Sequence, residues 1–210
     1  MTLQMESLAL SLDANGVVQV EMTRPVIDAV MIGELADTYT RMSEDPAVRA
    51  VVLSGQGDAF STGADLRRVV RANHATEWSV ADTRAFARML WLIESCSKPT
   101  IARIHGVVAG SGIALVCACE FGLAADDAGF AAAELGRSDV PAVIRPYLVG
   151  KVGKQQAQRL TLAGGRIDAQ QARAIGLVQT VVPGHELDAA TRALAAFLGM
   201  VPMRSAHRGL

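Results

Sequence analysis

The segment from Arg103 to Glu134 restricts the possible folds of this chain more than any other stretch. Residues Arg103–Gly112 predict a strand that ends in a turn of small residues, and the apolar run Ile113–Cys119 predicts a helix directly after it. The first amides of such a helix have no partner within the helix and lie at the positive end of its dipole. Small residues in the turn therefore leave these amides open to an anion or a carbonyl oxygen.

Glu134 follows this helix in a run of small apolar residues, Gly129–Ala133. A carboxylate with apolar neighbours is a candidate for proton-transfer chemistry, because burial favours its neutral form. The alternative is a salt-bridged carboxylate with a structural role. The segment thus predicts open backbone amides and one candidate acid or base in a single short stretch.

The composition predicts one main domain that binds neither nucleic acid nor a membrane surface. The chain has 210 residues, of which 50% are hydrophobic, enough for a substantial core. The net charge is −1, and charges of both signs are interleaved. Residues Met1–Leu12 contain no basic segment leading into an apolar run, and no apolar stretch approaches about 18 residues. We expect a cytoplasmic protein without a membrane-spanning segment.

The three cysteines predict free thiols. Cys96, Cys117 and Cys119 are odd in number, lie among apolar residues and have no metal-ligand spacing with any histidine. This pattern is typical of a reducing compartment, and we expect no metal site.

Apolar periodicity predicts strands that alternate with helices. Leu8–Leu12 and Val17–Met22 alternate at period two around an Asn-Gly turn, which is typical of a hairpin. An amphipathic helix follows, with apolar positions at Val30, Met31, Leu35, Tyr39 and Met42, and ends at Asp45-Pro46. The β-branched run Val48–Leu53 predicts a strand covered on both faces, and a loop over residues 54–63 is expected after it.

The second half of the chain continues the alternation. A helix is expected around Phe86–Ile93, followed by strands at Thr100–Ile104 and Glu120–Ala125. Further helices are expected over Lys154–Leu162, Ala169–Ile175 and Glu186–Met200. A short strand is expected at Val178–Val182. Strands that alternate with helices indicate an α/β domain with helices packed on a sheet.

Two loops of small residues are candidates for a binding site. They are Phe60–Leu66 and His105–Gly112, each expected after a strand and before a helix. Each alone is consistent with a glycine turn that serves only backbone geometry. Together they can present one amide apiece to a single oxygen atom, which is the arrangement of an oxyanion hole. The spacing of Gly106, Gly110 and Gly112 does not fit a dinucleotide-binding motif.

These loops, with three further motifs, resemble the enoyl-CoA hydratase/isomerase (crotonase) family. The other motifs are Arg24-Pro25, Pro141–Tyr147, and Leu162–Ala169 continuing to Gly176-Leu177-Val178. The resemblance implies an α/β fold of the ClpP/crotonase type, with a spiral core of ββα units in residues 1–150 and C-terminal helices in residues 151–210, shortened relative to the family. It also implies a homotrimer or a hexamer built from trimers.

The resemblance further implies an acyl-CoA thioester substrate, with coenzyme A as part of that substrate and no separate cofactor. The amides of Ala64 and Ser111 would bind the thioester oxygen, although a glycine is usual at the position of Ser111. Glu134 would be the catalytic acid or base, and Asp139 a possible second acid or a solvated aspartate paired with an arginine. The residues expected to contact coenzyme A are Arg24, Ala29, Gly63, Asp65, Leu66, Arg67 and Gly110.

One departure from the family affects the predicted reaction. Hydratases of the family usually carry two glutamates, and the first would fall at Ala114. Water addition classically uses a base and an acid, whereas one carboxylate can move a proton between two carbons. This favours an isomerase, yet the Glu134–Tyr147 stretch also resembles hydratases that lack the first glutamate, so hydratase and isomerase both remain open. Further alternatives are a non-catalytic thioester-binding paralogue, and a decarboxylase or hydrolase that uses Asp139.

The C-terminal segment bears on assembly. Helical spacing places Leu187, Ala190, Leu194, Phe197 and Leu198 on one face of the last expected helix. An exposed apolar face of that size is unusual, so we expect it to pack on the core or on a neighbouring subunit.

Overall fold

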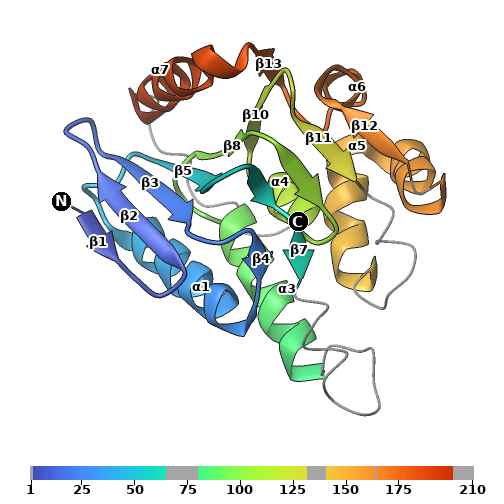
Figure 1. Cartoon of the computed structure of the whole chain (residues 1–210). Coiled ribbons are helices and arrows are strands. Elements are labelled where there is room, and N and C mark those ends of the chain that lie inside the picture. The colour runs from blue at the N-terminus through green and yellow to red at the C-terminus, as the bar shows by residue number, and fades with distance from the viewer. Residues whose placement is uncertain (1, 65–79, 132–140, 164, 201–210) are drawn as a thin grey trace.

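The computed structural model describes residues 2–64, 80–131, 141–163 and 165–200. A seven-stranded sheet forms its centre, with the strand order β1-β2-β3-β5-β8-β10-β13 (Figure 1). The first two pairs are antiparallel and the other pairs are parallel. The strands are β1 (Thr2–Gln4), β2 (Leu8–Leu12), β3 (Val17–Met22), β5 (Ala50–Gly55), β8 (Thr100–Ile104), β10 (Phe121–Ala125) and β13 (Thr180–Val182).

Two smaller sheets lie beside the large one. The first has the order β12-β11-β9-β6, and the second pairs β4 with β7. Their strands are β4 (Val26–Ile27), β6 (Ala59–Ser61), β7 (Gly63–Ala64), β9 (Val107–Ala109), β11 (Gly129–Ala131) and β12 (Arg166–Asp168). These short strands carry both loops of the predicted site.

The helices are positioned by local capping and by apolar faces. In α1 (Ala29–Glu44), the N-cap Asp28 accepts a hydrogen bond from the Met31 amide at 3.0 Å, and Asp168 starts α6 (Ala169–Ala174) through a capping box with Gln171. The others are α3 (Val80–Glu94), α4 (Gly112–Ala118), α5 (Pro141–Ala163), the 3-10 turn η2 (Gly184–Glu186) and α7 (Leu187–Met200).

The chain repeats one path four times. A strand of the seven-stranded sheet is followed by one or two short strands in a smaller sheet and then by a helix. The successive turns are β3-β4-α1, β5-β6-β7 leading to α3, β8-β9-α4, and β10-β11 leading to α5. This is the spiral of ββα units that the family resemblance implies, and each turn delivers its short strand to the same side of the molecule (Figure 1).

The large sheet is covered on both faces, as its apolar composition predicts. Val51 and Leu53 of β5 join the core under α1, α3 and α4, whereas Ala50 and Val52 of the same strand join a second core under α7. In Figure 1, α7 lies above the sheet, and α1 and α3 lie below it. Alternation along a strand places successive side chains on opposite faces, so one apolar run fills both cores.

Several predicted elements need correction. Residues 103–112 are not one strand, because β8 ends at Ile104 and β9 begins a new sheet after Gly106, whose φ is 58°. The expected loop at residues 54–63 contains β6 and the start of β7. The helix predicted at residues 154–162 is the second half of α5, which is interrupted at Gly153 with a φ of 77°. The strand β12 was not predicted.

Two side chains at apolar positions of the predicted helices are exposed in the single chain. Val30 is 37% exposed at the start of α1, where Ile32 is buried instead. Phe197 is 61% exposed on α7, which faces the sheet with Leu187, Thr191, Ala195 and Gly199. Packing of Phe197 on a neighbouring subunit, the alternative given above, stays a prediction.

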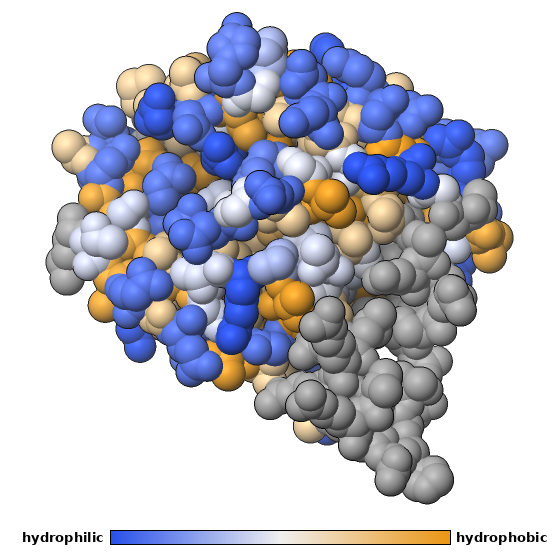
Figure 2. All heavy atoms as spheres, in the orientation of Figure 1, coloured by the Kyte–Doolittle hydropathy of each residue, from blue (hydrophilic) through white to orange (hydrophobic). Residues whose placement is uncertain are grey.

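Among the described residues, no helix combines the length and the apolar character that crossing a membrane requires. On the face drawn in Figure 2, hydrophilic side chains are interspersed with smaller apolar areas.

Candidate functional site

The first loop is held by the backbone that follows Arg24. Buried Ser61 donates its hydroxyl hydrogen to the Pro25 carbonyl oxygen at 2.9 Å and accepts a hydrogen bond from the Gly63 amide at 3.2 Å. The Thr62 amide also donates to the Pro25 oxygen, at 2.8 Å. Gly63 then turns with a φ of 89° into β7, which pairs with β4. The Arg-Pro motif therefore positions the first loop rather than standing apart from it.

The second loop connects β9 to α4. Gly110 has a φ of 52°, and its amide donates to the Ala131 carbonyl oxygen at 3.1 Å. Ser111 is the N-cap of α4, but its side chain makes no capping hydrogen bond. Its backbone is already helical, with φ −66° and ψ −12°, whereas a serine that caps through its side chain is usually extended.

The two loops touch, with no room for a side chain between them. A Cβ atom placed on Gly63 would lie 2.8 Å from the Ala109 carbonyl oxygen and 3.1 Å from the Ser111 nitrogen. A Cβ atom on Gly112 would lie 2.8 Å from Cβ of Ser61. Real Cβ atoms essentially never come within 3.0 Å of another heavy atom, so glycine at both positions permits the contact.

Four of the predicted site residues thus lie together. Gly63 and Ala64 come from β7, and Gly110 and Ser111 precede α4 on the adjoining loop. Five others lie outside the described residues, and the predictions for them stand untested: Glu134, Asp139, Asp65, Leu66 and Arg67. The strand before Glu134, β11, lies within the described residues. It runs parallel to β9, and its Ala131 pairs with Ala109.

Arg24 and Ala29, both expected to contact coenzyme A, lie around the start of α1. Arg24 donates through Nη2 to Ser7 Oγ at 2.5 Å and forms an ion pair with Asp28 at 3.0 Å. Its buried Nε has no hydrogen-bond partner in the structure. Ala29 is the exposed first residue of α1. The guanidinium of Arg24 therefore already serves the fold, and its role toward a phosphate remains a prediction.

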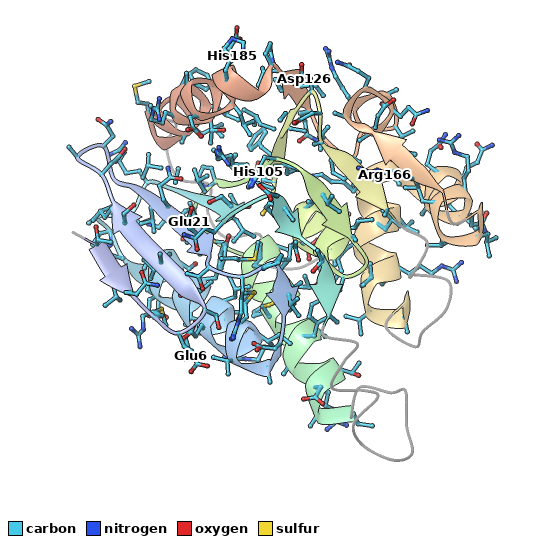
Figure 3. All side chains as sticks on the ribbon, viewed as in Figure 1. Glu6, Glu21, His105, Asp126, Arg166 and His185 are labelled. Carbon is cyan, nitrogen blue, oxygen red and sulfur yellow. The ribbon has the colours of Figure 1, made fainter. Side chains whose placement is uncertain are left out.

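His105 has the structural role that its position in a turn suggests. Its Nε2 lies 2.7 Å from the Gly57 carbonyl oxygen, which only accepts, so Nε2 carries the proton. Its Nδ1 then accepts from Arg103 Nη1 at 3.2 Å, and Arg103 pairs with Asp188 at 2.6 Å. Figure 3 shows His105 where β8 gives way to β9. The histidine braces the loop between the sheets and is not free to act as a base.

The thiols behind the second loop are buried and inert. Desolvation by burial raises the pKa of Cys117 and that of Cys119 to about 12, and the nearby Lys151 ammonium offsets this only in part. Burial also raises the pKa of Tyr39 well above its ordinary value. Lys151 Nζ donates to the carbonyl oxygens of Cys119 and Glu120 at 2.7 and 2.9 Å, where α4 ends. Sequence reasoning did not anticipate this lysine, nor the Ser61 brace.

No candidate metal centre accompanies the loops. Within the described ranges, no group of three or more His, Cys, Asp or Glu side chains is placed to hold a metal ion. What the site offers is backbone amides at the junction of two loops.

A protein-family comparison agrees with this geometry. The family described as enoyl-CoA hydratase/isomerase matches residues 13–206. The chain belongs to this family. It is 34% identical over 158 residues to a crotonyl-CoA hydratase of Syntrophomonas wolfei, covering 73% of this chain and 59% of that protein. It is 32% identical over 215 residues to a mitochondrial Delta(3,5)-Delta(2,4)-dienoyl-CoA isomerase of Pongo abelii, covering 91% and 63%.

Solved structures of family members share the fold. An enoyl-CoA hydratase from Shewanella pealeana superposes with a TM-score of 0.83 at 29% identity, covering 93% of this chain and 74% of that one. The crotonase-like α/β fold is thereby confirmed. The chain spans less than two thirds of the length of the two relatives above, 59% and 63%.

Proposed function

We propose that this member of the enoyl-CoA hydratase/isomerase family is an enzyme that converts acyl-CoA thioesters through an enolate. The observation that carries the proposal is the contact between the two loops, in which Gly63 lies against the Ser111 nitrogen. The contact brings Gly63, which directly precedes Ala64, next to Ser111 at the start of α4. In the proposed site, two amides from these different loops donate to one oxygen atom.

Such an arrangement suits a thioester that becomes an enolate. Removing a proton next to the carbonyl, or adding a nucleophile to a conjugated double bond, transfers negative charge to the carbonyl oxygen. In the proposed site the Ala64 and Ser111 amides donate to that oxygen. A preorganised donor of this kind contributes about 3 kcal/mol to the stability of the transition state.

Glu134 is the proposed acid and base. It follows Ala131 by three residues, and Ala131 accepts a hydrogen bond from Gly110 in the second loop. Three residues of chain span at most about 10 Å, so the sequence separation alone limits how far this carboxylate lies from the loop. In an isomerase it would take a proton from C2 of a 3-enoyl thioester and return it at C4. In a hydratase it would activate the water that adds to C3, or protonate C2.

The choice between these reactions depends on a second acid. Ala114, where relatives with two glutamates carry the first, is fully buried in α4 and supplies none. Single-carboxylate chemistry therefore has the stronger support, and the isomerase reaction requires only that. A decarboxylase or hydrolase would need Asp139 at the site.

The test is the Glu134→Gln variant, assayed with 2-enoyl-CoA for hydration and 3-enoyl-CoA for isomerisation. Loss of a positioned acid or base lowers kcat by about 10²–10⁴-fold. Asp139→Asn is the matched control, because it removes a neighbouring carboxylate with the same loss of charge. Full turnover in Glu134→Gln would overturn the assignment, and loss of activity only in Asp139→Asn would assign the acid or base of the measured reaction to Asp139 instead.

A second candidate function is a protein that binds acyl thioesters without converting them. Two observations favour it: Ala114 carries no acid, and the Val26–Ala29 segment contains no cation for the phosphates of coenzyme A. In both readings coenzyme A is part of the ligand, and no separate cofactor is proposed. Calorimetry that detects butyryl-CoA binding in a protein that converts neither enoyl-CoA isomer would establish this alternative.

We further propose that the protein assembles as a homotrimer, or as a hexamer built from two trimers, and acts in cytoplasmic fatty acid metabolism. The support for the assembly comes from the family resemblance, together with exposed Phe197 and Met200 at the end of α7. Light scattering should give a mass of three or six times 22.1 kDa. A monomer at micromolar concentration would contradict the proposed assembly.

A further inference from the structure

Ser111 carries a buried hydroxyl group that the fold does not use. The residue is 3% exposed, and its Oγ has no hydrogen-bond partner among the residues that the structure describes. It stands at the N-cap of α4 without making the side-chain capping bond that a serine usually makes there. Buried polar groups are nearly always paired in folded proteins, so an unpaired one calls for an explanation.

The hydroxyl lies beside the atoms proposed to bind the thioester oxygen. A Cβ atom on Gly63 would be 3.1 Å from the Ser111 nitrogen and 3.3 Å from Ser111 Oγ. The amide and the hydroxyl of Ser111 therefore both face Gly63, the residue before Ala64. The other serine at this junction, Ser61, uses its hydroxyl fully, since it donates to Pro25 and accepts from Gly63. The Ser111 hydroxyl is therefore the donor at this junction that has no partner among the described residues.

We propose that the Ser111 hydroxyl is a third hydrogen-bond donor to the thioester oxygen, beside the amides of Ala64 and Ser111. The inference rests on the proposed acyl-CoA chemistry and names a further residue for it. A neutral carbonyl oxygen accepts a third hydrogen bond weakly beside the two amides, whereas an enolate oxygen carries a full negative charge and accepts it strongly. The hydroxyl therefore acts mainly as charge develops, and it contributes to kcat more than to substrate affinity.

The experiment compares wild type with Ser111→Ala, Ser111→Gly and Ser111→Thr. All of them keep the backbone amide at position 111, and only threonine keeps a hydroxyl. We expect Ser111→Ala to lower kcat by about 10-fold with little change in KM, which is less than the loss of about 10²–10³-fold seen when a main oxyanion donor is removed. Ser111→Thr should retain most of the activity. Ser111→Gly should resemble alanine, and it provides a second variant if alanine fails to fold.

A spectroscopic readout separates hydrogen bonding from structural effects. Butyryl-CoA labelled with ¹³C at the carbonyl carbon does not react, and its bound carbonyl stretch reports the donors at the oxygen. The stretch should lie at higher frequency in the alanine and glycine variants than in wild type and threonine. An unchanged stretch and an unchanged kcat in Ser111→Ala would overturn the donor role while leaving the proposed function intact. Absence of butyryl-CoA binding to wild type, measured by calorimetry, would overturn the proposed function itself.

Discussion

At the scale of residues, the contact between the two loops of the candidate site depends on glycines. Gly63 and Gly112 carry no side chain, and this absence lets the first loop touch the second. The sequence predicted two loops of small residues and their cooperation, but it did not indicate which glycine faces which partner. Gly63 is needed both for its φ of 89° and for space, whereas Gly112 is needed only for space.

Gly112→Ala tests this contact without introducing backbone strain. The added methyl group would come 2.8 Å from Cβ of Ser61, whose hydroxyl is fixed by two hydrogen bonds. Such overpacking lowers the free energy of unfolding by about 1–3 kcal/mol. Urea denaturation measures it.

The control is Gly33→Ala, which lies within helix α1. A Cβ atom there meets no atom of the structure within 4 Å, and alanine in a helix is more stable than glycine by about 0.5–1 kcal/mol. Opposite signs are therefore expected for the two variants. A Gly112→Ala protein as stable as wild type would show that the loops have room to separate.

At the scale of elements, α4 combines an N-terminal end at the candidate site with a buried, apolar body. Every residue from Gly112 to Ala118 is buried, and Lys151 closes the far end through the carbonyl oxygens of Cys119 and Glu120. Burial of the two thiols, Cys117 and Cys119, keeps them protonated.

Stability should therefore decrease in alkali. In the unfolded chain both thiols ionise near pH 9.0, but in the folded protein their pKa values are about 12. Between these values the unfolded chain binds fewer protons, so the free energy of unfolding falls by roughly 1 kcal/mol per thiol for each pH unit. The lowered pKa of Lys151, caused mainly by desolvation, acts in the opposite direction below pH 10.5 but involves only one group.

Urea denaturation under reducing conditions at pH 8 and pH 10.5 measures this dependence. A Cys117→Ala/Cys119→Ala variant is the control, and it should show a distinctly smaller loss of stability between the two pH values. Equal losses in the two proteins would mean that other groups, such as Tyr39, dominate the alkaline response.

The sequence predicted long elements well and short ones poorly. The hairpin of β2 and β3, the helix α1 and the apolar strand β5 have enough residues to show a period. The strands β6, β7 and β12 have two or three residues each, too few to distinguish a strand from a loop. Because both site loops lie next to such short strands, the sequence predicted that the loops act together but not which of their residues touch. The spiral path itself came from the family resemblance.

At the scale of the whole molecule, one sheet separates two cores. The larger core lies under α1, α3 and α4, and the smaller one is closed by α7 alone. Helical spacing predicted that Leu187 and Phe197 share one face of α7, and in the single chain Leu187 is buried whereas Phe197 is exposed. Spacing identifies an apolar stripe but not which of its residues contact the sheet.

Ala195→Asp tests the role of α7 as the cover of the second core. Ala195 is fully buried among Ala50, Val52 and Leu123, and a carboxylate there would have no partner. An isolated buried charge destabilises a protein by several kcal/mol, about 3–5 when it lacks a counter-ion. Ala193→Asp, on the exposed side of the same helix, should stay within about 0.5 kcal/mol of wild type.

Thermal unfolding monitored by circular dichroism compares the two variants. Equal melting temperatures would show that α7 is not needed to close the sheet. A lower melting temperature in Ala195→Asp alone would locate the effect at the interface with the sheet.

The order of strands in the large sheet has a consequence for synthesis on the ribosome. Read from one edge to the other, β1, β2, β3, β5, β8, β10 and β13 follow their order along the chain. Each parallel strand therefore pairs with one that was translated earlier, and none has to wait for a later strand or enter between two existing ones. The nascent chain can extend the sheet at a single growing edge, with the helix of each turn covering the strand just added. In this sheet β13 is translated after the other six strands, and α7 follows it to cover the second face.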